Sequence, residues 1–559
     1  MRFLKNKKNN IDVDEIFMDA QNIPGFHTEN FEGTIEKPIK KNVFLYIEIF
    51  FCAVGIFFLV RAGFLEIAKG EYFKTRAEKN YLRQVDIEPE RGVVFDRNMF
   101  ALTINELEKN DSLNQKWIRK YPVNGFLHVL GFLSRQENQY LANGVSGFEL
   151  FYNDILKGKP GKFLEEINAK GDIFSSGISI KPKKGENILS SLSYDLTLKL
   201  AQIVSNTADQ YKFNGGAAVV INPQNGEVLS LLSIPDFDPN ILSKNPSKET
   251  IEKLINDVKK PFFNRAVSGL YSPGSIVKPA IAVGALSEGI IVPEKQILSS
   301  SPIVIQNPFS PQKPDIFPDW KQHGWVDMRR AIAVSSDIYF YTVGGGYQDQ
   351  VGLGVNKIEK YFQMFGFGKN TGIDLPGEKS GYLPDPNKLT GDSRKWGIGD
   401  TYHLSIGQGD LQVTPVQMAL YASILATGGS VVIPHLVKSV LKDNGNLKEN
   451  FSYSIKNIED IKKETFDIVR EGMRDAVKYG TASGLSGYPI EIAAKTGTAE
   501  VGKTGYVHSW SIGFMPYENP KIAWAVVMEK GPISNTVGST YVVSQMIQWM
   551  LQNKFLDTI

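Results

Sequence analysis

The sequence predicts a multidomain α+β protein that one N-terminal helix anchors in a membrane. Residues 43–60 form an apolar run that only Glu48 interrupts, and from Asn187 onward segments typical of strands alternate with segments typical of helices. The chain has 559 residues, of which 42% are apolar and 22% are charged. It is therefore too long for one small domain, and its composition is that of a globular protein with a sizeable core.

Residues 1–41 and 42–67 are predicted to form a tail and a transmembrane anchor. The tail contains seven acidic and seven basic residues with little hydrophobic periodicity, which is typical of disordered segments. The apolar run after it is long enough to cross a bilayer. Glu48 costs roughly 3 kcal/mol in such a helix, and its apolar neighbours can offset that cost. A buried core helix is the alternative interpretation.

The residues beside the apolar run predict its orientation. Lys37, Lys40 and Lys41 directly precede the run, and basic residues favour the cytoplasmic side of a membrane. Because no small-residue cleavage site follows, we expect a retained signal anchor. The N-terminus is then cytoplasmic, and the chain after about Gly70 lies outside the cytoplasmic membrane.

Two later segments predict regular elements. Residues 215–232 have the pattern of a β-hairpin, with its turn at residues 223–226. Residues 412–425 predict a helix with Pro415 in its first turn, where a proline is tolerated.

Three short motifs occur in a fixed order and together predict an acyl-transfer site. They are the Ser-x-x-Lys of Ser275 and Lys278, the Ser-x-Asp of Ser335 and Asp337, and the Lys-Thr-Gly that begins at Lys495. A serine, a lysine, a further hydroxyl and a second lysine are the groups that such a site uses.

The first motif needs support from its context, because Ser-x-x-Lys is expected about twice by chance in a chain of this length. It also begins at Ser310 and Ser439. Prolines around Ser310 exclude a helix, and Ser439 lies in an apolar run typical of a strand. Ser275 instead follows a Pro-Gly turn and begins a predicted helix over residues 275–286, which places it on one face with Lys278.

A phosphate-loop pattern competes for the third motif. Residues 497–504 match G-x-x-x-x-G-K-[ST], which chance produces in only about one chain in fifty. Such a loop needs a helix directly after it, whereas residues 506–514 are aromatic and typical of a strand. Lys503 begins a second Lys-Thr-Gly, but we predict that it lies at the tip of a hairpin. We therefore take Lys495 as the functional lysine.

Composition and compartment exclude several classes of partner. The formal net charge is +2 and no basic patch with interleaved aromatic residues stands out, so nucleic acid is not expected as a partner. Nucleotides are not supplied outside the cytoplasmic membrane, which argues further against a phosphate loop. Cys52 is the single cysteine, which excludes an intramolecular disulfide framework.

Beyond the anchor, the chain resembles the class B penicillin-binding proteins, the membrane-anchored D,D-transpeptidases of bacterial cell-wall synthesis. Residues 89–98 are similar to the family's box after the membrane helix. The pedestal of the family is similar to residues 144–149 and 156–161, and its catalytic domain to residues 237–240, 264–266, 407–409 and 414–417. Residues 319–324 and the Ser-x-Asp form of the second motif are more similar to the elongation type, penicillin-binding protein 2, than to the division type.

The resemblance implies a pedestal (dimerisation-like) domain in residues 68–186 and a transpeptidase domain in residues 187–559. In the latter, helices sandwich an antiparallel sheet, as in serine β-lactamases. Only about twenty residues separate Asn98 from Tyr121, where the family usually inserts a longer head, so we expect this head to be largely absent. Ser336 stands where some elongation enzymes carry a zinc-binding cysteine.

The resemblance also implies a role for each motif residue. Ser275 is the expected nucleophile, and Lys278 takes its proton as a free amine. The lysine pKa must then fall from about 10.4 toward roughly 7 or 8, and burial and the charge of Lys495 both lower it. Ser335 is expected to relay the proton to the leaving D-alanine. Asp337 could pair with either lysine, and pairing would raise the pKa of its partner.

The remaining expected roles concern binding of the substrate. The backbone N–H groups of Ser275 and Thr498 are expected to hold the oxyanion. Lys495, Thr496, Gly497 and Thr498 are expected to bind the terminal carboxylate of the donor peptide. An amine of a neighbouring stem peptide then attacks the acyl-enzyme and forms the cross-link.

We expect no cofactor and no tightly bound metal, although Asp319 and His323 are weak candidates for a metal site. The expected partners are peptidoglycan stem peptides, a SEDS-family wall glycosyltransferase, the inner membrane, and β-lactam antibiotics as covalent inhibitors. A division-type transpeptidase, a β-lactam sensor and a catalytically silent scaffold for a wall glycosyltransferase are alternatives. A sensor should have a cytoplasmic output domain, and a scaffold should have lost at least one catalytic residue.

Overall fold

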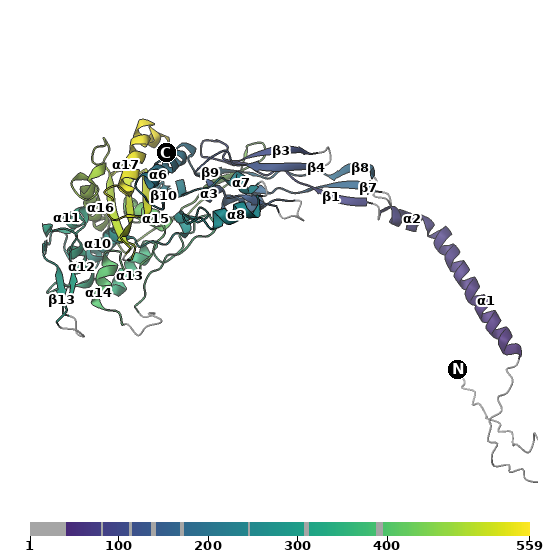
Figure 1. Cartoon of the computed structure of the whole chain (residues 1–559), viewed down its shortest axis with the longest axis horizontal. Helices are drawn as coiled ribbons and strands as arrows, with labels where there is room; N and C mark the ends of the chain where they lie inside the picture. Colours follow the sequence, from purple (N-terminus) through teal and green to yellow (C-terminus); the bar gives the residue numbers. More distant parts are fainter. Residues whose placement is uncertain are drawn as a thin grey trace, which may run out of the picture. The chain divides into compact units, whose positions relative to one another are not determined.

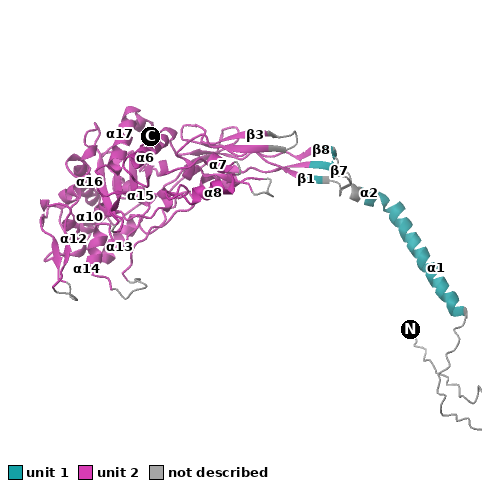
Figure 2. Cartoon of the chain, viewed as in Figure 1, with its two compact units in different colours: residues 1–84, 164–176 teal, residues 85–163, 177–559 magenta. Residues whose placement is uncertain are grey.

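The computed structural model describes most of the chain. The described residues are 41–79, 82–110, 114–135, 141–167, 173–243, 246–306, 312–386, 395–502 and 504–559. They form two compact units, residues 1–84 with 164–176 and residues 85–163 with 177–559 (Figure 2). The predictions for the tail up to residue 40, for Ser310 and for Lys503 lie outside the described residues.

The predicted anchor is helical. Helix α1 (Lys41–Gly63) continues through a π-helical turn, η4 (Phe64–Ala68), and is followed by α2 (Gly70–Lys79) (Figure 1). Residues 42–68 are long and apolar enough to cross a membrane, and none of their most apolar stretch is buried against the rest of the protein. A buried core helix would be covered by its neighbours, so the structure does not support that alternative.

Short strands follow the anchor. Strands β1 (Leu82–Ile87), β7 (Gly161–Ile167) and β8 (Ile173–Ile180) form a sheet in the order β1-β7-β8. Strands β3 (Ile104–Asn110) and β4 (Asn114–Lys120) form an antiparallel hairpin in which Leu107 lies opposite Trp117. This hairpin lies between Asn98 and Tyr121, and the shortened head expected there stays a prediction. The domain boundaries at 67/68 and 186/187 stay predictions.

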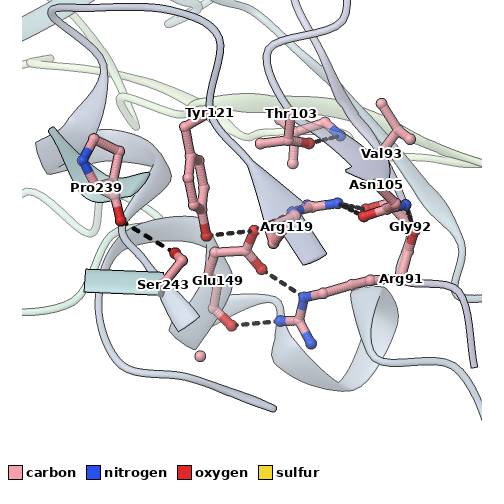
Figure 3. A network of polar contacts seen from close by, with 12 residues as sticks. Arg91, Gly92, Val93, Thr103, Asn105, Arg119, Tyr121, Glu149, Pro239 and Ser243 are labelled. Atoms are coloured by element: carbon pink, nitrogen blue, oxygen red, sulfur yellow. Dashed lines mark hydrogen bonds and ion pairs between the residues drawn. The ribbon is translucent and has the colours of Figure 1, made fainter. Parts of the chain in front are cut away.

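A buried polar network holds this region together (Figure 3). Glu149, on α4 (Gly147–Phe151), is fully buried and accepts hydrogen bonds from Arg91 Nε at 2.6 Å and Arg119 Nε at 2.7 Å. The Tyr121 hydroxyl donates to the same carboxylate at 3.3 Å. Burial alone would raise the pKa of Glu149, but the charges and hydrogen bonds of Arg119 and Arg91 lower it below its usual value.

The C-terminal part of the chain is built on a five-stranded antiparallel sheet in the order β11-β10-β22-β21-β20. The predicted hairpin over residues 215–232 is confirmed as β10 and β11, where Val219 pairs with Leu231. The five strands are β10 (Gly215–Ile221), β11 (Val228–Ile234), β20 (Ala493–Glu500), β21 (Tyr506–Met515) and β22 (Ile522–Pro532).

Helices cover both faces of this sheet (Figure 1). Alternate residues of β10 enter two different cores, because Val219 packs into one and Val220 into the other. The first core contains α10 (Lys278–Ser287), α11 (Met328–Val334), α12 (Asp337–Gly345), α13 (Val355–Met364) and α15 (Pro415–Thr427), and the second contains α6 (Tyr194–Gln210) and α17 (Ser539–Gln552). The predicted α+β architecture, with an antiparallel sheet between helices, is therefore confirmed.

The predicted helix over residues 412–425 is confirmed as α15. Thr414 caps its N-terminus in a capping box with Gln417, and Pro415 occupies the first turn. A second sheet has the order β18-β17-β9-β2. Its strands are β18 (Leu447–Asn450), β17 (Val437–Leu441), β9 (Asn187–Ser190) and β2 (Val94–Phe95).

The other elements are short, apart from the amphipathic helix α16 (Lys463–Lys478). The remaining strands are β5 (Leu133–Ser134), β6 (Asn143–Gly144), β12 (Ile297–Ser299), β13 (Ile303–Ile305), β14 (Asp315–Phe317), β15 (Gly324–Val326), β16 (Ser430–Val432) and β19 (Ile455–Asn457). The remaining helices are α3 (Leu127–Leu130), α5 (Asn153–Leu156), α7 (Pro239–Ser243), α8 (Lys248–Ile255), α9 (Arg265–Ser268), α14 (Ile398–Ser405), η6 (Ser483–Leu485) and η7 (Phe555–Thr558).

Candidate active site

The first motif begins in a tight helical turn. The predicted helix over residues 275–286 starts later than expected, because η5 (Gly274–Val277) is a 3₁₀ turn and α10 begins at Lys278. Such turns are frequent at helix N-termini. Gly274 has φ +59°, and a Cβ there would lie 2.6 Å from the carbonyl oxygen of Thr498. Only glycine therefore lets this turn adopt its conformation and approach β20 so closely.

The second motif connects two helices. Helix α11 ends at Val334, Ser335 caps its C-terminus with φ 60° and ψ 42°, and Ser336 caps the N-terminus of α12. This left-handed conformation is unfavourable for a residue with a side chain, and it persists where the surroundings hold it in place. The turn aims both the hydroxyl and the carbonyl group of Ser335 at the ammonium group of Lys278.

Lys278 is fully buried and donates three hydrogen bonds. Its Nζ lies 2.7 Å from Ser335 O, 3.2 Å from Ser335 Oγ and 2.6 Å from Asp337 Oδ1. The structure thus settles the question of which lysine pairs with Asp337. The carboxylate pairs with Lys278, and the side chain of Asp337 is 16% exposed.

Lys495 reaches the same serine from β20. Its Nζ is fully buried, 2.9 Å from Ser335 Oγ and 2.9 Å from the carbonyl oxygen of Thr496. Burial and the positive charge of Lys278 lower the pKa of Lys495 well below its usual value, and Asp337 only partly opposes them. The Ser335 hydroxyl therefore lies between two buried lysines, only one of which contacts a carboxylate.

The predicted nucleophile, Ser275, lies in the turn η5, which packs against β20. Ser275 is partly exposed, and its hydroxyl makes no hydrogen bond to any other residue that the structure describes. The predicted proton transfer from Ser275 to Lys278 stays a prediction, because catalytic hydrogen bonds often form only once substrate is bound.

The third motif lines a groove at one edge of the sheet. Strand β20 is the last in the sheet order, and the Thr496 hydroxyl donates to Thr481 Oγ1 at 2.7 Å. A Cβ on Gly497 would lie 2.8 Å from Pro273 O, so glycine allows β20 to approach the turn that carries Ser275. Thr496, Gly497 and Thr498 line a cavity of about 560 Å³ that extends to the N-terminus of α17.

The competing motifs lie in other surroundings. Ser439 is buried in β17, as the sequence predicts for a strand residue. The phosphate-loop match begins within β20 and ends before β21, and these two strands form an antiparallel hairpin with Thr498 opposite Ser509. A strand rather than a helix follows the match, as predicted, so it lacks the helix N-terminus that a phosphate loop needs.

The weak metal candidates lie next to the second motif. Asp319 Oδ1 and His323 Nε2 are 3.7 Å apart and are both buried. Among the described residues, no group of three or more His, Cys, Asp or Glu side chains is placed to hold a metal ion. Ser336 instead donates a hydrogen bond to Asp319 at 2.9 Å. Structural zinc takes four ligands, commonly Cys or His, so these residues do not fit a zinc site.

Sequence reasoning missed two contacts of this loop. The indole N–H of Trp320 donates to Ser335 O at 3.2 Å, and Ser299 Oγ donates to Asp319 Oδ2 at 2.6 Å. Ser299 belongs to no recognisable motif, and Trp320 lies in residues 319–324, which the sequence singles out only by their resemblance to the elongation type. The only signal in the sequence is the Asp-Trp pair within residues 319–324.

Comparisons with known proteins identify the family of the chain. The model of the penicillin-binding protein transpeptidase domain matches residues 216–545. The peptidoglycan D,D-transpeptidase MrdA of Acinetobacter baumannii is 29% identical, and the match covers 89% of this chain and 86% of the relative.

Two solved structures are similar over most of the chain. Pseudomonas aeruginosa PBP2 in complex with WCK 5153 has a TM-score of 0.69 and 29% identity, and the match covers 84% of this chain and 97% of that one. A chain from a structure of a peptidoglycan synthase complex that coordinates polymerization and crosslinking has a TM-score of 0.70 and 26% identity, over 90% and 97% of the two chains. This chain belongs to the penicillin-binding protein transpeptidase family, among its class B members of the elongation type.

Proposed function

We propose that this membrane-anchored peptidoglycan D,D-transpeptidase of the elongation type works through a serine acyl-enzyme formed on Ser275. The observation that carries the proposal is the Ser335 hydroxyl, which lies 3.2 Å from the Nζ of Lys278 and 2.9 Å from that of Lys495. A hydroxyl between two amines can accept a proton from one and donate a proton to the other.

The resting site favours a proton on Lys278 and a neutral amine on Lys495. All three N–H donors of Lys278 have acceptors, one of them the carboxylate of Asp337. The pKa of Lys495 is lowered by burial and by Lys278. We infer that the hydroxyl of Ser335 passes the proton from Lys278 to Lys495, which leaves Lys278 able to accept the proton of Ser275. With this relay Lys278 can act as the predicted base, although its Nζ donates three hydrogen bonds in the resting site.

The acylation step forms one bond to Ser275 and breaks one amide bond of the donor peptide. Ser275 Oγ forms a bond to the carbonyl carbon of the penultimate D-alanine, and the amide bond to the terminal D-alanine breaks. The proton from Ser275 passes through Lys278 and Ser335 to the leaving amine. The amine of a second stem peptide then forms an amide bond to the same carbonyl carbon, the ester bond to Ser275 Oγ breaks, and the proton of the amine passes to Ser275 Oγ. General acid and base catalysis of this kind contributes typically about 10²–10⁴-fold.

Substrate binding is assigned to the edge of the sheet. The amide groups of Ser275 and Thr498 would hold the oxyanion, and the close approach of Gly274 to Thr498 O supports this pairing of turn and strand. The donor carboxylate would bind at Lys495, Thr496 and Thr498, with Gly497 allowing the close approach. An edge strand offers unpaired backbone groups to an extended peptide.

The partners and the orientation follow from the chain and its relatives. A structural relative belongs to a peptidoglycan synthase complex that couples polymerization to crosslinking, which supports a SEDS-family glycosyltransferase as partner. β-Lactams would acylate Ser275 as substrate mimics. The lysines before the anchor favour a cytoplasmic N-terminus and an extracytoplasmic catalytic domain. The relatives do not favour a division-type enzyme, a sensor or a silent scaffold.

Labelling with a fluorescent penicillin tests the proposal in membranes that contain the full chain. The wild type should be labelled covalently, and Ser275→Ala should abolish the label. Ser439→Ala is the matched control, because it removes a hydroxyl from a Ser-x-x-Lys sequence that lies on a strand. Label that persists in Ser275→Ala would refute the assignment of the nucleophile.

A further inference from the structure

Two consecutive residues, Asp319 and Trp320, form hydrogen bonds with the second motif. Neither belongs to the three motifs. We propose that Asp319 is a positioning residue that acts through hydrogen bonds, assisted by Trp320, and fixes Ser335 and Asp337 against Lys278. This inference rests on the proposed function, because it concerns how fast Ser275 is acylated.

The Asp319 carboxylate is the centre of a hydrogen-bond cluster. Its side chain is only 4% exposed. Oδ2 accepts from Ser299 Oγ at 2.6 Å and from Ser336 Oγ at 2.9 Å, and these two hydroxyls lie 2.8 Å apart. Both serines are fully buried. A buried carboxylate with several donors is strongly held, because charge-assisted hydrogen bonds are stronger than neutral ones.

The same carboxylate binds the N-terminus of α12. Oδ1 accepts from the backbone N–H of Asp337 at 3.1 Å, and Oδ2 accepts from that of Ile338 at 3.3 Å. Anions are stabilised at helix N-termini, where backbone N–H groups lack partners within the helix. Asp319 therefore determines where α12 begins, and with it the position of the Asp337 carboxylate that contacts Lys278 at 2.6 Å.

Trp320 completes the clamp at Ser335. Its backbone N–H donates to Asp319 Oδ1 at 2.9 Å, and its indole N–H donates to Ser335 O at 3.2 Å. Ser335 O is also an acceptor for Lys278. The left-handed conformation of Ser335 needs contacts that hold it. The Asp319–Trp320 pair supplies one contact to each residue of the turn, at Ser335 O, Ser336 Oγ and Asp337 N.

The cluster does this without fitting a metal. Its polar groups are one carboxylate that accepts, and two hydroxyls and backbone amides that donate; His323 Nε2 lies 3.7 Å from Asp319 Oδ1 with no hydrogen-bond partner among the described residues. Both oxygens of Asp319 already accept hydrogen bonds. The hydroxyl of Ser336 donates directly to Asp319 and so holds the turn. A thiolate at this position has no proton to donate, and it would need a metal ion between itself and Asp319.

The test measures acylation of the full chain in membranes by a fluorescent penicillin, with the acylation rate constant separated from the preceding affinity. Asp319→Ala should lower the acylation rate constant at least tenfold and change the affinity less than threefold. Asp319→Asn, which retains one oxygen acceptor for the amide of Asp337, should recover part of the rate. Trp320→Phe, which removes only the donor to Ser335 O, should lower the rate about two- to fivefold.

Asp327→Ala is the matched control. Asp327 caps the N-terminus of α11 through the backbone N–H of Arg330, at the end of the helix opposite Ser335, so its loss weakens this helix without removing a hydrogen bond of the second motif. Its melting temperature should fall while its acylation rate stays within twofold of wild type. A purely structural role for Asp319 would instead make the rates of all variants follow their melting temperatures.

Several results would overturn the proposed role of Asp319. Wild-type acylation in Asp319→Ala, or no partial recovery in Asp319→Asn, overturns the proposal. If Asp319→Ala does not fold, Asp319→Asn and Trp320→Phe decide it by the same criteria. Loss of labelling after EDTA treatment of the wild type also overturns it, because a metal would then hold the turn. Label that survives Ser275→Ala refutes the proposed function itself, whatever the Asp319 variants show.

Discussion

The network around Glu149 and the active site each combine one carboxylate with two basic side chains, but they arrange them differently. Glu149 contacts both of its partners, Arg91 at 2.6 Å and Arg119 at 2.7 Å (Figure 3). In the active site, Asp337 contacts Lys278 at 2.6 Å. Lys495 has a hydroxyl and a carbonyl oxygen as acceptors instead.

The choice of cation explains the difference in role. A guanidinium keeps its proton in proteins, and its planar group forms several hydrogen bonds in a fixed geometry. Arg91, Arg119 and Glu149 therefore form a permanently charged structural contact, which we call the joint. A buried lysine can release its proton, and the lowered pKa of Lys495 shows that this environment favours release. A site for proton transfer thus uses lysines, and a joint uses arginines.

The largest expected effect comes from replacing Lys278 in the active site by arginine, the residue type that pairs with Glu149. Lys278→Arg keeps a positive charge beside Asp337 but removes the group that can accept a proton. We expect it to slow acylation by penicillin about 10²–10⁴-fold, as general-base loss typically does, and Lys278→Met to do the same. The measurement is the rate of covalent labelling per folded molecule.

The reverse exchange in the joint is its control. Arg91→Lys should lower stability, because an ammonium cannot replace the contacts of Arg91 to Glu149 and Asn153. It should leave the labelling rate of the folded protein within threefold of wild type. Fast labelling in Lys278→Arg would mean that charge, not proton transfer, is what the lysine supplies.

The next effect concerns the carboxylate of the joint. Glu149→Gln leaves two buried guanidiniums without their counter-charge, and removing one partner of a buried pair typically costs about 3–5 kcal/mol. The free energy of unfolding of the full chain in detergent should fall by this order. Glu186→Gln, which removes a partly exposed pair with Lys448, should cost less than about 1 kcal/mol. Equal losses in the two variants would contradict the structural role of the joint.

A smaller effect should appear in the pH dependence of stability. Between the lowered pKa of Lys495 and the ordinary lysine value of about 10.4, the unfolded chain binds one proton more than the folded chain. Stability attributable to this group therefore rises with pH over that window. Lys495→Met removes this slope, so we expect the variant to be the more stable form at neutral pH.

The advantage of the Lys495→Met variant should shrink as the pH approaches the ordinary lysine value. Melting temperatures of both forms between pH 6 and about pH 10 check this. A constant difference over the whole range would show that Lys495 keeps its proton in the folded protein.

The smallest expected effect is that of metal removal. Ser336 binds Asp319 by a hydrogen bond, and a neutral hydroxyl is a poor zinc ligand. After dialysis against EDTA, the purified full chain should contain well under one zinc per molecule and melt at an unchanged temperature. A stoichiometric zinc that resists EDTA and is lost in His323→Ala would contradict this.

Much of the fold followed from local patterns. The hairpin β10–β11 and the helix α15 were predicted from turn residues and from a proline at a helix start, which act within a few neighbouring residues. The rejection of the phosphate loop was predicted from the strand that follows it and was confirmed by β21. The start of α10 was predicted three residues too early, because sequence patterns do not distinguish a 3₁₀ turn from the first turn of an α-helix.

The candidate site was predicted as a set of residues but not as an arrangement. The order of the motifs and the family resemblance named Ser275, Lys278, Ser335 and Lys495. They left open the partner of Asp337 and overlooked Asp319 and Trp320 as supports of the turn.

The sequence by itself predicted the anchor, the alternation of strands and helices, and a set of candidate reactive groups, because these depend on residue type and short spacing. The tertiary structure alone decided which lysine Asp337 neutralises and which lysine is pushed toward its neutral form. Those outcomes depend on contacts between residues 59 and 160 positions apart in the chain. Burial and the distance between charges set a pKa, and neither can be read from positions along a chain.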